Sequence, residues 1–219
     1  ETVRARVDLA KILVEQEKYA EAEPMLVAAL KQLQQIQPGP PELSIAHTHR
    51  VLGGMYCRMG KFREAEPLLD KSLATFTRVA GEHPVTASVL NARGRLRMET
   101  WRFELALIDF NESLAICKKT LGEDHPLTAR VLENQATLYE YGTNTGMARQ
   151  VRLQCLRICE QAFGELSLQT ASALENIART NLAMHDYGLA ETYLLRAREI
   201  RRKLLGDAHP QTAAIVGQL

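Results

Sequence analysis

The sequence predicts an all-α fold, an α-solenoid in which antiparallel helix pairs stack one after another. Three observations support this prediction. A short phrase returns every 42 residues, small residues recur in columns at nearly the same period, and the apolar residues between them follow helical spacing. A two-helix unit of this length cannot bury its apolar face alone, so such units must stack on their neighbours.

The returning phrase is centred on a Thr-Ala pair. Its threonines are 42 residues apart, at Thr86, Thr128, Thr170 and Thr212. Three of the four copies have a histidine and a proline just ahead of the pair, at His83-Pro84, His125-Pro126 and His209-Pro210. In the remaining copy Ser167 takes the place of the histidine. The common register indicates copies of one structural unit.

Three columns of small residues share this period. The first column is Ala10, Gly53, Gly94, Ala136 and Ala178. The second is Ala22, Ala65, Ala106, Ala148 and Ala190. The third is Ala29, Ser72, Ser113, Cys155 and Ala197. Small side chains at fixed places allow two helix backbones to approach closely, so each column is expected at a helix–helix contact.

The apolar spacing divides each repeat into two helices. The expected pairs are 1–16 with 19–36, 42–59 with 62–79, 84–100 with 103–120, 126–141 with 145–162, and 168–184 with 187–205. The repeats then cover about 1–40, 41–81, 82–122, 123–164 and 165–206, and 207–219 starts a sixth pair at Pro210. We expect one array over 1–219. Because the sequence opens without methionine and ends inside the pattern, we interpret it as a segment of a longer protein.

The returning phrase is interpreted mainly as helix punctuation. A proline suits the first position of a helix, where no amide partner is needed. Asp124 or His125 can accept from the amides of the first turn that follows, and Ser167 can do so in its repeat. Glycines that follow the long second helices, Gly122, Gly164 and Gly206, suit a left-handed C-terminal cap.

Composition narrows the class of protein. Of 219 residues, 46% are hydrophobic and 24% are charged, which is typical of a globular chain. Lys and Arg number 27 against 26 Asp and Glu, so the net charge of +1 gives no bias toward nucleic acid or membrane. No apolar run approaches the roughly 20 residues of a membrane span. Four cysteines are too few for a disulfide scaffold and favour a reducing, cytoplasmic location.

Motifs for chemistry are weak. The stretch 54–61 resembles a phosphate loop, but it has the wrong glycine spacing and Phe62 where a magnesium ligand is required. Cys155 and Cys159 are four apart and are assigned to core packing, because a zinc site needs four ligands. The basic run 196–203 is assigned to a solvated helix end. We therefore expect no enzyme activity, no cofactor, no metal and no nucleic-acid partner.

The repeats resemble tetratricopeptide repeats of the kinesin-light-chain type, which have about 42 residues rather than 34. The phrases that carry the resemblance are 19–26 (YAEAEPML), 62–69 (FREAEPLL) and 122–129 (GEDHPLTA). The sequence departs from the family at Arg97, where a tyrosine is usual, and at Arg152, where a bulky apolar residue is usual. Residues 142–146 (GTNTG) also replace the usual turn.

The resemblance implies a right-handed superhelix whose concave groove is lined by the first helix of each pair. It also implies that Asn91, Asn134 and Asn176 face this groove and contact the backbone of a ligand. A side-chain amide suits this role because it both donates and accepts. Helical spacing adds four arginines to the same face, Arg50, Arg95, Arg130 and Arg179. Arginine favours an acidic-leaning ligand, although Glu133, Glu140 and Glu175 offset part of the charge. Intramolecular Arg–Glu pairs on a solvated face are an equal alternative.

The predicted function is that of a non-catalytic module that binds a peptide or a partner helix in the groove. The alternative is a regulatory segment that packs in cis against a catalytic or nucleotide-switch domain of a larger protein. Self-association through the terminal repeats is also open. No membrane partner is expected.

Overall fold

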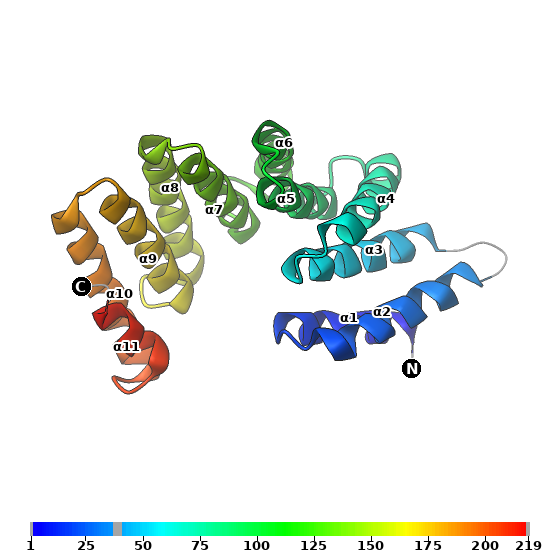
Figure 1. Cartoon of the computed structure of the whole chain (residues 1–219), viewed down its shortest axis with the longest axis horizontal. Helices are drawn as coiled ribbons and strands as arrows, with labels where there is room; N and C mark the ends of the chain where they lie inside the picture. Colours follow the sequence, from blue (N-terminus) through cyan, green and yellow to red (C-terminus); the bar gives the residue numbers. More distant parts are fainter. Residues whose placement is uncertain (1, 37–40, 218–219) are drawn as a thin grey trace. The chain divides into compact units, whose positions relative to one another are not determined.

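The computed structural model describes residues 2–36 and 41–217, and every regular element within these ranges is an α-helix. The helices, labelled in Figure 1, are α1 (Val3–Glu15), α2 (Tyr19–Gln34), α3 (Glu42–Arg58), α4 (Phe62–Ala80), α5 (Pro84–Glu99), α6 (Phe103–Leu121), α7 (Pro126–Tyr141), α8 (Thr145–Phe163), α9 (Leu168–Ala183), α10 (Tyr187–Leu205) and α11 (Pro210–Val216). These bounds agree closely with the expected helix ranges. The expected junction of the first two repeats, at 37–40, lies outside the described residues.

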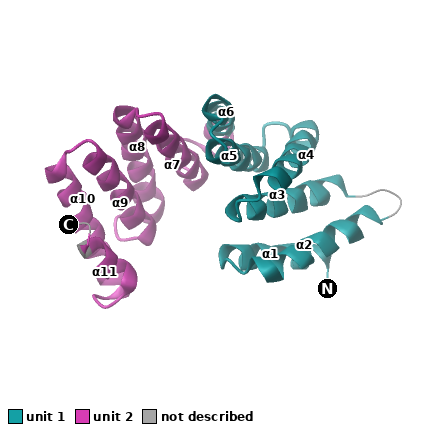
Figure 2. Ribbon diagram, viewed as in Figure 1, with its two compact units in different colours: residues 1–116 teal, residues 117–219 magenta. Residues whose placement is uncertain are grey.

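The chain divides into two compact units, residues 1–116 and 117–219, with the boundary inside α6 (Figure 2). In the first unit α1 packs on α2, α2 on α3, α3 on α4 and α4 on α5. In the second unit α7 packs on α8, α8 on α9, α9 on α10 and α10 on α11. Packing in chain order is the mark of a solenoid, so the predicted fold class is confirmed.

The three columns of small residues lie at buried positions, as predicted. In the third column two side chains also bond the second helix of a pair to the first. The Ser72 hydroxyl donates to the carbonyl of Ala46 at 2.8 Å, and Ser113 donates to the carbonyl of Ala87 at 2.7 Å. These positions therefore combine a close helix approach with a satisfied buried hydroxyl.

Histidine caps open three of the first helices. Nδ1 of His83, His125 and His209 accepts a hydrogen bond from the backbone amide two residues later in the chain, at 3.2, 3.0 and 3.2 Å. Of the two candidates for the cap of α7, His125 is therefore the one used. Ser167 accepts from the amide of Thr170 at 3.1 Å, as predicted.

The glycines that follow the second helices differ from the prediction. Gly164 has φ 83° and ψ 161°, and Gly206 has φ 88° and ψ 164°. Their φ is positive, which explains the choice of glycine. Their ψ is extended, not near the +47° of a left-handed helix. The prediction of a left-handed cap is thus wrong in ψ, because the chain must leave in an extended direction toward the next helix start.

The left-handed residue lies instead in the short turn inside each pair. Five equivalent residues have φ between 60° and 72°: Glu17, Gly60, Trp101, Thr143 and His185. The amide after each of them bonds back to a carbonyl near the helix end, as from Arg102 to Arg97 at 2.8 Å. This is the Schellman pattern, in which glycine is preferred. Trp101 occupies such a turn with 73% of its surface exposed, and its ring centroid lies 5.6 Å from that of Phe103.

We predict that Thr143→Gly raises the free energy of unfolding by about 1 kcal/mol. A β-branched residue at φ 61° is strained, and the left-handed conformation costs a non-glycine residue about 1–2 kcal/mol. The flexibility that glycine adds to the unfolded chain offsets part of this gain. Urea unfolding measures the change. The reverse change at the equivalent turn, Gly60→Thr, should destabilise, and a gain from both substitutions would contradict the argument.

Candidate functional site

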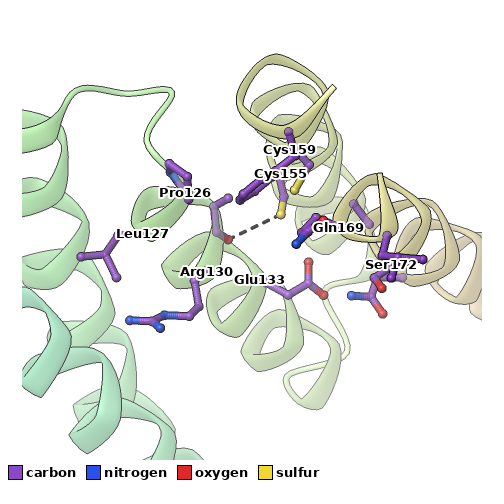
Figure 3. A pocket seen from close by; sticks show the side chains of 13 residues that line it. Pro126, Leu127, Arg130, Glu133, Cys155, Cys159, Gln169 and Ser172 are labelled. Atoms are coloured by element: carbon purple, nitrogen blue, oxygen red, sulfur yellow. Dashed lines mark hydrogen bonds between the residues drawn. The ribbon is translucent and has the colours of Figure 1, made fainter. Parts of the chain in front are cut away.

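The candidate site is an open pocket in the second unit with a volume of about 700 Å³ (Figure 3). Three helices contribute to it. Successive turns of α7 contribute the lining residues Pro126, Ala129, Arg130 and Glu133. The equivalent face of α9 contributes Gln169, Ser172, Ala173 and Asn176, and α8 contributes Cys155, Cys159 and Phe163. The pocket therefore lies between two first helices and the second helix that separates them.

The lining is mostly apolar, with a few polar groups placed among the apolar ones. Arg130 is exposed, while Glu133 and Asn176 are half-buried. Burial raises the pKa of the Glu133 carboxyl, although the charge of Arg152 acts in the opposite direction. The Cys155 thiol is buried and donates to the carbonyl of Ala129 at 3.5 Å. Such a mixture of apolar surface and few orienting groups is typical of binding pockets.

Arg152 holds the three helices of the pocket together. Its side chain is 0% exposed, although arginine is rarely buried. From α8 it bonds to both carboxylate oxygens of Glu140 on α7, at 2.6 and 2.9 Å. It also donates to the carbonyl of Asn176 on α9 at 2.7 Å and to the hydroxyl of Thr180. The departure noted in the sequence at this position is thus a buried polar junction among the three helices that line the pocket.

The structure brings some of the predicted groove residues of the second unit together. Arg130 and Asn176 line the pocket, from α7 and α9. Arg179 does not line it, but it donates to Oδ1 of Asn176 at 2.9 Å. Asn134 is half-buried and lies outside the lining.

The predicted groove residues of the first unit differ in their exposure and surroundings. Arg50 is half-buried, and its guanidinium lies 3.5 Å from Nδ1 of His47. Asn91 is only 5% exposed, so little of its amide can reach a ligand. Arg95 is exposed and lines a separate polar pocket of about 490 Å³ with Glu17 and Glu99.

Sequence reasoning assigned Cys155 and Cys159 to core packing and did not consider Phe163. All three line the pocket, at the spacing i, i+4 and i+8 along α8. This spacing is a signal that they share one helical face. The sequence could not show that this face is partly open, because that depends on the distance between α7 and α9.

The basic run 196–203 was predicted to be a solvated face, but Arg201 is buried. Arg201 is only 7% exposed. It pairs with Glu175 at 2.5 Å and donates to the side-chain carbonyl of Gln211 at 2.6 Å. Because it joins α9, α10 and α11, Arg201 is a packing residue. Arg196, Arg202 and Lys203 are exposed, as predicted.

Within residues 2–36 and 41–217, no three histidine, cysteine or acidic side chains are grouped to hold a metal ion. No disulfide joins cysteines in the same ranges. Among the helices described, none combines the length and the apolar character that a membrane crossing requires.

We predict that Glu133→Gln raises the unfolding midpoint at pH 7 and has a smaller effect at pH 4. The raised pKa means that the folded protein holds the carboxyl proton more tightly than the unfolded chain does. The charged form therefore costs stability, and this cost grows as the pH rises above the unfolded pKa of about 4.3. Thermal unfolding of both proteins at the two pH values measures it. An effect of the same size at both pH values would contradict the assignment to the carboxyl charge.

Comparison with known proteins identifies the family of repeats to which these helix pairs belong. A family model of the tetratricopeptide repeat matches residues 1–78, 42–100, 86–161, 144–203 and 169–219. No sequence among curated proteins matches the chain. Solved structures match it at low identity, so they bear on the fold alone.

Three of these structures are similar over most of their length. BtubC (BKLC) from P. vanneervenii has a TM-score of 0.76 at 22% identity, over 92% of this chain and 80% of that one. A kinesin-light-chain-like protein with nearly identical TPR-like repeats, from Podosopora anserina, has a TM-score of 0.71 at 20% identity, over 93% and 96%. The apo form of RapI has a TM-score of 0.75 at 17% identity, over 99% and 81%.

The family model covers the chain from end to end, and the helix pairs follow the 42-residue period on which the resemblance rests. Tetratricopeptide repeats are in general scaffolds for protein–protein interaction and not catalysts. The chain belongs to the tetratricopeptide-repeat family.

Proposed function

We propose that the chain is a non-catalytic interaction module that binds an extended peptide or a partner helix in the pocket of α7, α8 and α9. The observation that carries the proposal is the pocket itself. It is open, has a volume of about 700 Å³, and is mostly apolar with Arg130, Glu133 and Asn176 at its edge. An apolar side chain of the ligand would enter it, and burial of that side chain would supply most of the affinity.

The polar residues orient the ligand in this proposal. Arg179 donates to Oδ1 of Asn176, and in this proposal the amide nitrogen of Asn176 donates to a ligand carbonyl. Arg130 is exposed beside the apolar lining, where its planar fork suits a carboxylate. Glu133 carries the opposite charge close by, so we propose an acidic-leaning ligand rather than a strongly acidic one. Contacts of Arg50, Asn91, Arg95 and Asn134 with a ligand remain predictions, as does a cytoplasmic location.

Filling the pocket tests the proposal. A random peptide library is selected against the whole chain, and the dissociation constants of selected peptides are measured by calorimetry. Gln169→Trp places an indole in the pocket without removing a buried group, because Gln169 is exposed. We expect binding to weaken by about tenfold or more, a loss of about 1.4 kcal/mol. Asn176→Ala and Arg130→Glu should weaken the same peptides.

Gln154→Trp is the matched control, because Gln154 is exposed on α8 and lies outside the lining. It should leave binding unchanged. If no peptide is selected, or if the selected peptides bind the Gln169→Trp variant normally, the groove proposal fails. Packing in cis against another domain would then be favoured.

A further inference from the structure

Two cysteine thiols lie together in the wall of the pocket of the second unit. Cys155 and Cys159 are four residues apart on α8, and both belong to the lining (Figure 3). They are 5% and 7% exposed, and both are free cysteines. A hydrogen bond between the two thiols raises the pKa of Cys155 and lowers that of Cys159. We call Cys155 and Cys159 the α8 dithiol.

The helix fixes what kind of bond can join the two sulfur atoms. Side chains four residues apart on a helix have Cβ atoms about 5–6 Å apart, whereas a disulfide holds its Cβ atoms at about 3.5–4.5 Å. A direct S–S bond therefore does not fit without distortion of α8. A single atom bonded to both sulfurs lengthens the link, and the α8 dithiol is spaced for such a bridge.

The surroundings of the α8 dithiol disfavour a metal cation as the bridging atom. A structural zinc ion takes four ligands, and within residues 2–36 and 41–217 no three histidine, cysteine or acidic side chains are grouped to hold a metal. Cu(I), a soft cation that thiolates select, would leave a net negative charge on the pair once both protons are lost. The Glu133 carboxylate lines the same pocket, and its charge opposes the loss of a proton from either thiol. A charge buried without a partner is costly.

We propose that the α8 dithiol binds trivalent arsenic compounds of the type R–As(OH)₂, with the arsenic atom bridging Sγ of Cys155 and Sγ of Cys159. Two As–S bonds form and two As–O bonds break. Each thiol proton leaves with one hydroxyl group as water, so the oxidation states do not change. The product carries no net charge, which suits the mostly apolar lining. The R group occupies the pocket of about 700 Å³, whose lining continues with Phe163 one turn further along α8.

The proposed arsenic site and the proposed peptide site use the same pocket but fail separately. Capture of arsenic needs the two thiols and a path to them through the open pocket. It needs no peptide ligand, and it does not involve the polar groups of Arg130 and Asn176. The arsenic proposal can therefore hold if no peptide binds, and it can fail while peptides bind normally.

Phenylarsine oxide, in which R is a phenyl group, tests the proposal on the whole reduced chain. Binding is measured in an excess of β-mercaptoethanol, a monothiol that competes for any arsenic held by one sulfur alone. We expect one arsenic atom per chain by intact-mass spectrometry, a fall in free thiols from four to two, and release by the dithiol dithiothreitol. Cys155→Ala and Cys159→Ala should each weaken binding about 100-fold or more, because the second As–S bond gains from a high effective concentration.

The remaining cysteines provide matched controls. Cys117 lies one repeat before Cys159, is 0% exposed and is outside the lining, and Cys57 lies in the first unit. Cys117→Ala and Cys57→Ala should bind phenylarsine oxide as the original chain does. Circular dichroism at saturation should be unchanged, because an unfolded chain could present any two thiols.

Four results would overturn the proposal. The first is that no thiols are lost, and the second is that either alanine variant of the α8 dithiol binds as tightly as the original chain. The third is that binding requires Cys57 or Cys117. The fourth is that helix is lost as arsenic binds, since capture would then belong to the unfolded chain and not to the pocket.

Discussion

Arg152→Leu is expected to lower the free energy of unfolding by about 3–5 kcal/mol, the range for breaking a buried ion pair. The expectation runs against the repeat pattern, because leucine fills the equivalent positions at Leu26, Leu69 and Leu194. Arg152 is fully buried and holds the Glu140 carboxylate with two bonds, at 2.6 and 2.9 Å. Its loss leaves this charge without its main partner, in a place where water reaches it only in part.

The double variant Arg152→Leu/Glu140→Leu separates this cause from a packing effect. At the positions equivalent to Glu140 the chain has Met98 and Leu182, so an apolar residue fits the repeat. Replacement of a whole buried ion pair by apolar residues is often neutral or stabilising. Arg152 Nε also lies 3.3 Å from a carboxylate oxygen of Glu133, which the double variant leaves without this partner. We therefore expect the double variant to recover part of the stability lost in the single variant.

A double-mutant cycle by urea unfolding measures the coupling between the two residues. If the double variant is as unstable as Arg152→Leu, then the shape of the arginine and its bonds to α9 matter more than the charge pair. Because Arg152 also bonds the carbonyl of Asn176 at 2.7 Å, the recovered variant should still bind selected peptides more weakly than the original chain does.

Gly94→Ala is expected to lower the free energy of unfolding by about 2 kcal/mol or more, through overpacking. A Cβ atom at Gly94 would lie 2.6 Å from Cε1 and 2.8 Å from Cδ1 of Phe110. Phe110 is itself fully buried, so its ring has no room to withdraw. This steric cost outweighs the roughly 0.5–1 kcal/mol by which alanine favours a helix over glycine.

Two further variants test that reason. Gly54 is also inside a helix, but nothing lies within 4 Å of its added Cβ. Gly54→Ala should therefore stabilise by about 0.5–1 kcal/mol. The equivalent pairs Ala10 with Leu26 and Ala178 with Leu194 combine alanine with leucine. Adding Phe110→Leu to Gly94→Ala should relieve the clash, so the two substitutions should cost less together than the sum of their separate costs. Strict additivity would contradict a direct clash.

The sequence by itself determined the parts of this protein that depend on neighbours along the chain. A helix needs apolar residues at a fixed spacing and a cap at its start, and both are local. The helix ranges, the caps at His125 and Ser167 and the stacking of pairs were therefore predictable. The local pattern predicted the wrong ψ at Gly164 and Gly206, because ψ there depends on the direction in which the chain leaves the helix toward the next one.

Only the tertiary structure decided which polar residues are paired in the interior. Arg97, a departure from the family, pairs with Asp109 at 2.8 Å, and Arg93 pairs with the same fully buried carboxylate at 2.7 Å. Arg152 finds Glu140 and the backbone of Asn176 in the same way. A repeat pattern shows that a residue departs from its column, but it does not show which charge on the adjacent helix faces it.

The candidate pocket also depends on tertiary structure. Arg130 and Asn176 share it because α8 separates α7 from α9 by a particular distance, while Asn91, from the same phrase, is buried. Side-chain type sets what a residue can bind, and helix packing sets whether a ligand can reach it. The period of the sequence determines the order of the helix pairs, and the long-range contacts within the second unit determine the candidate site.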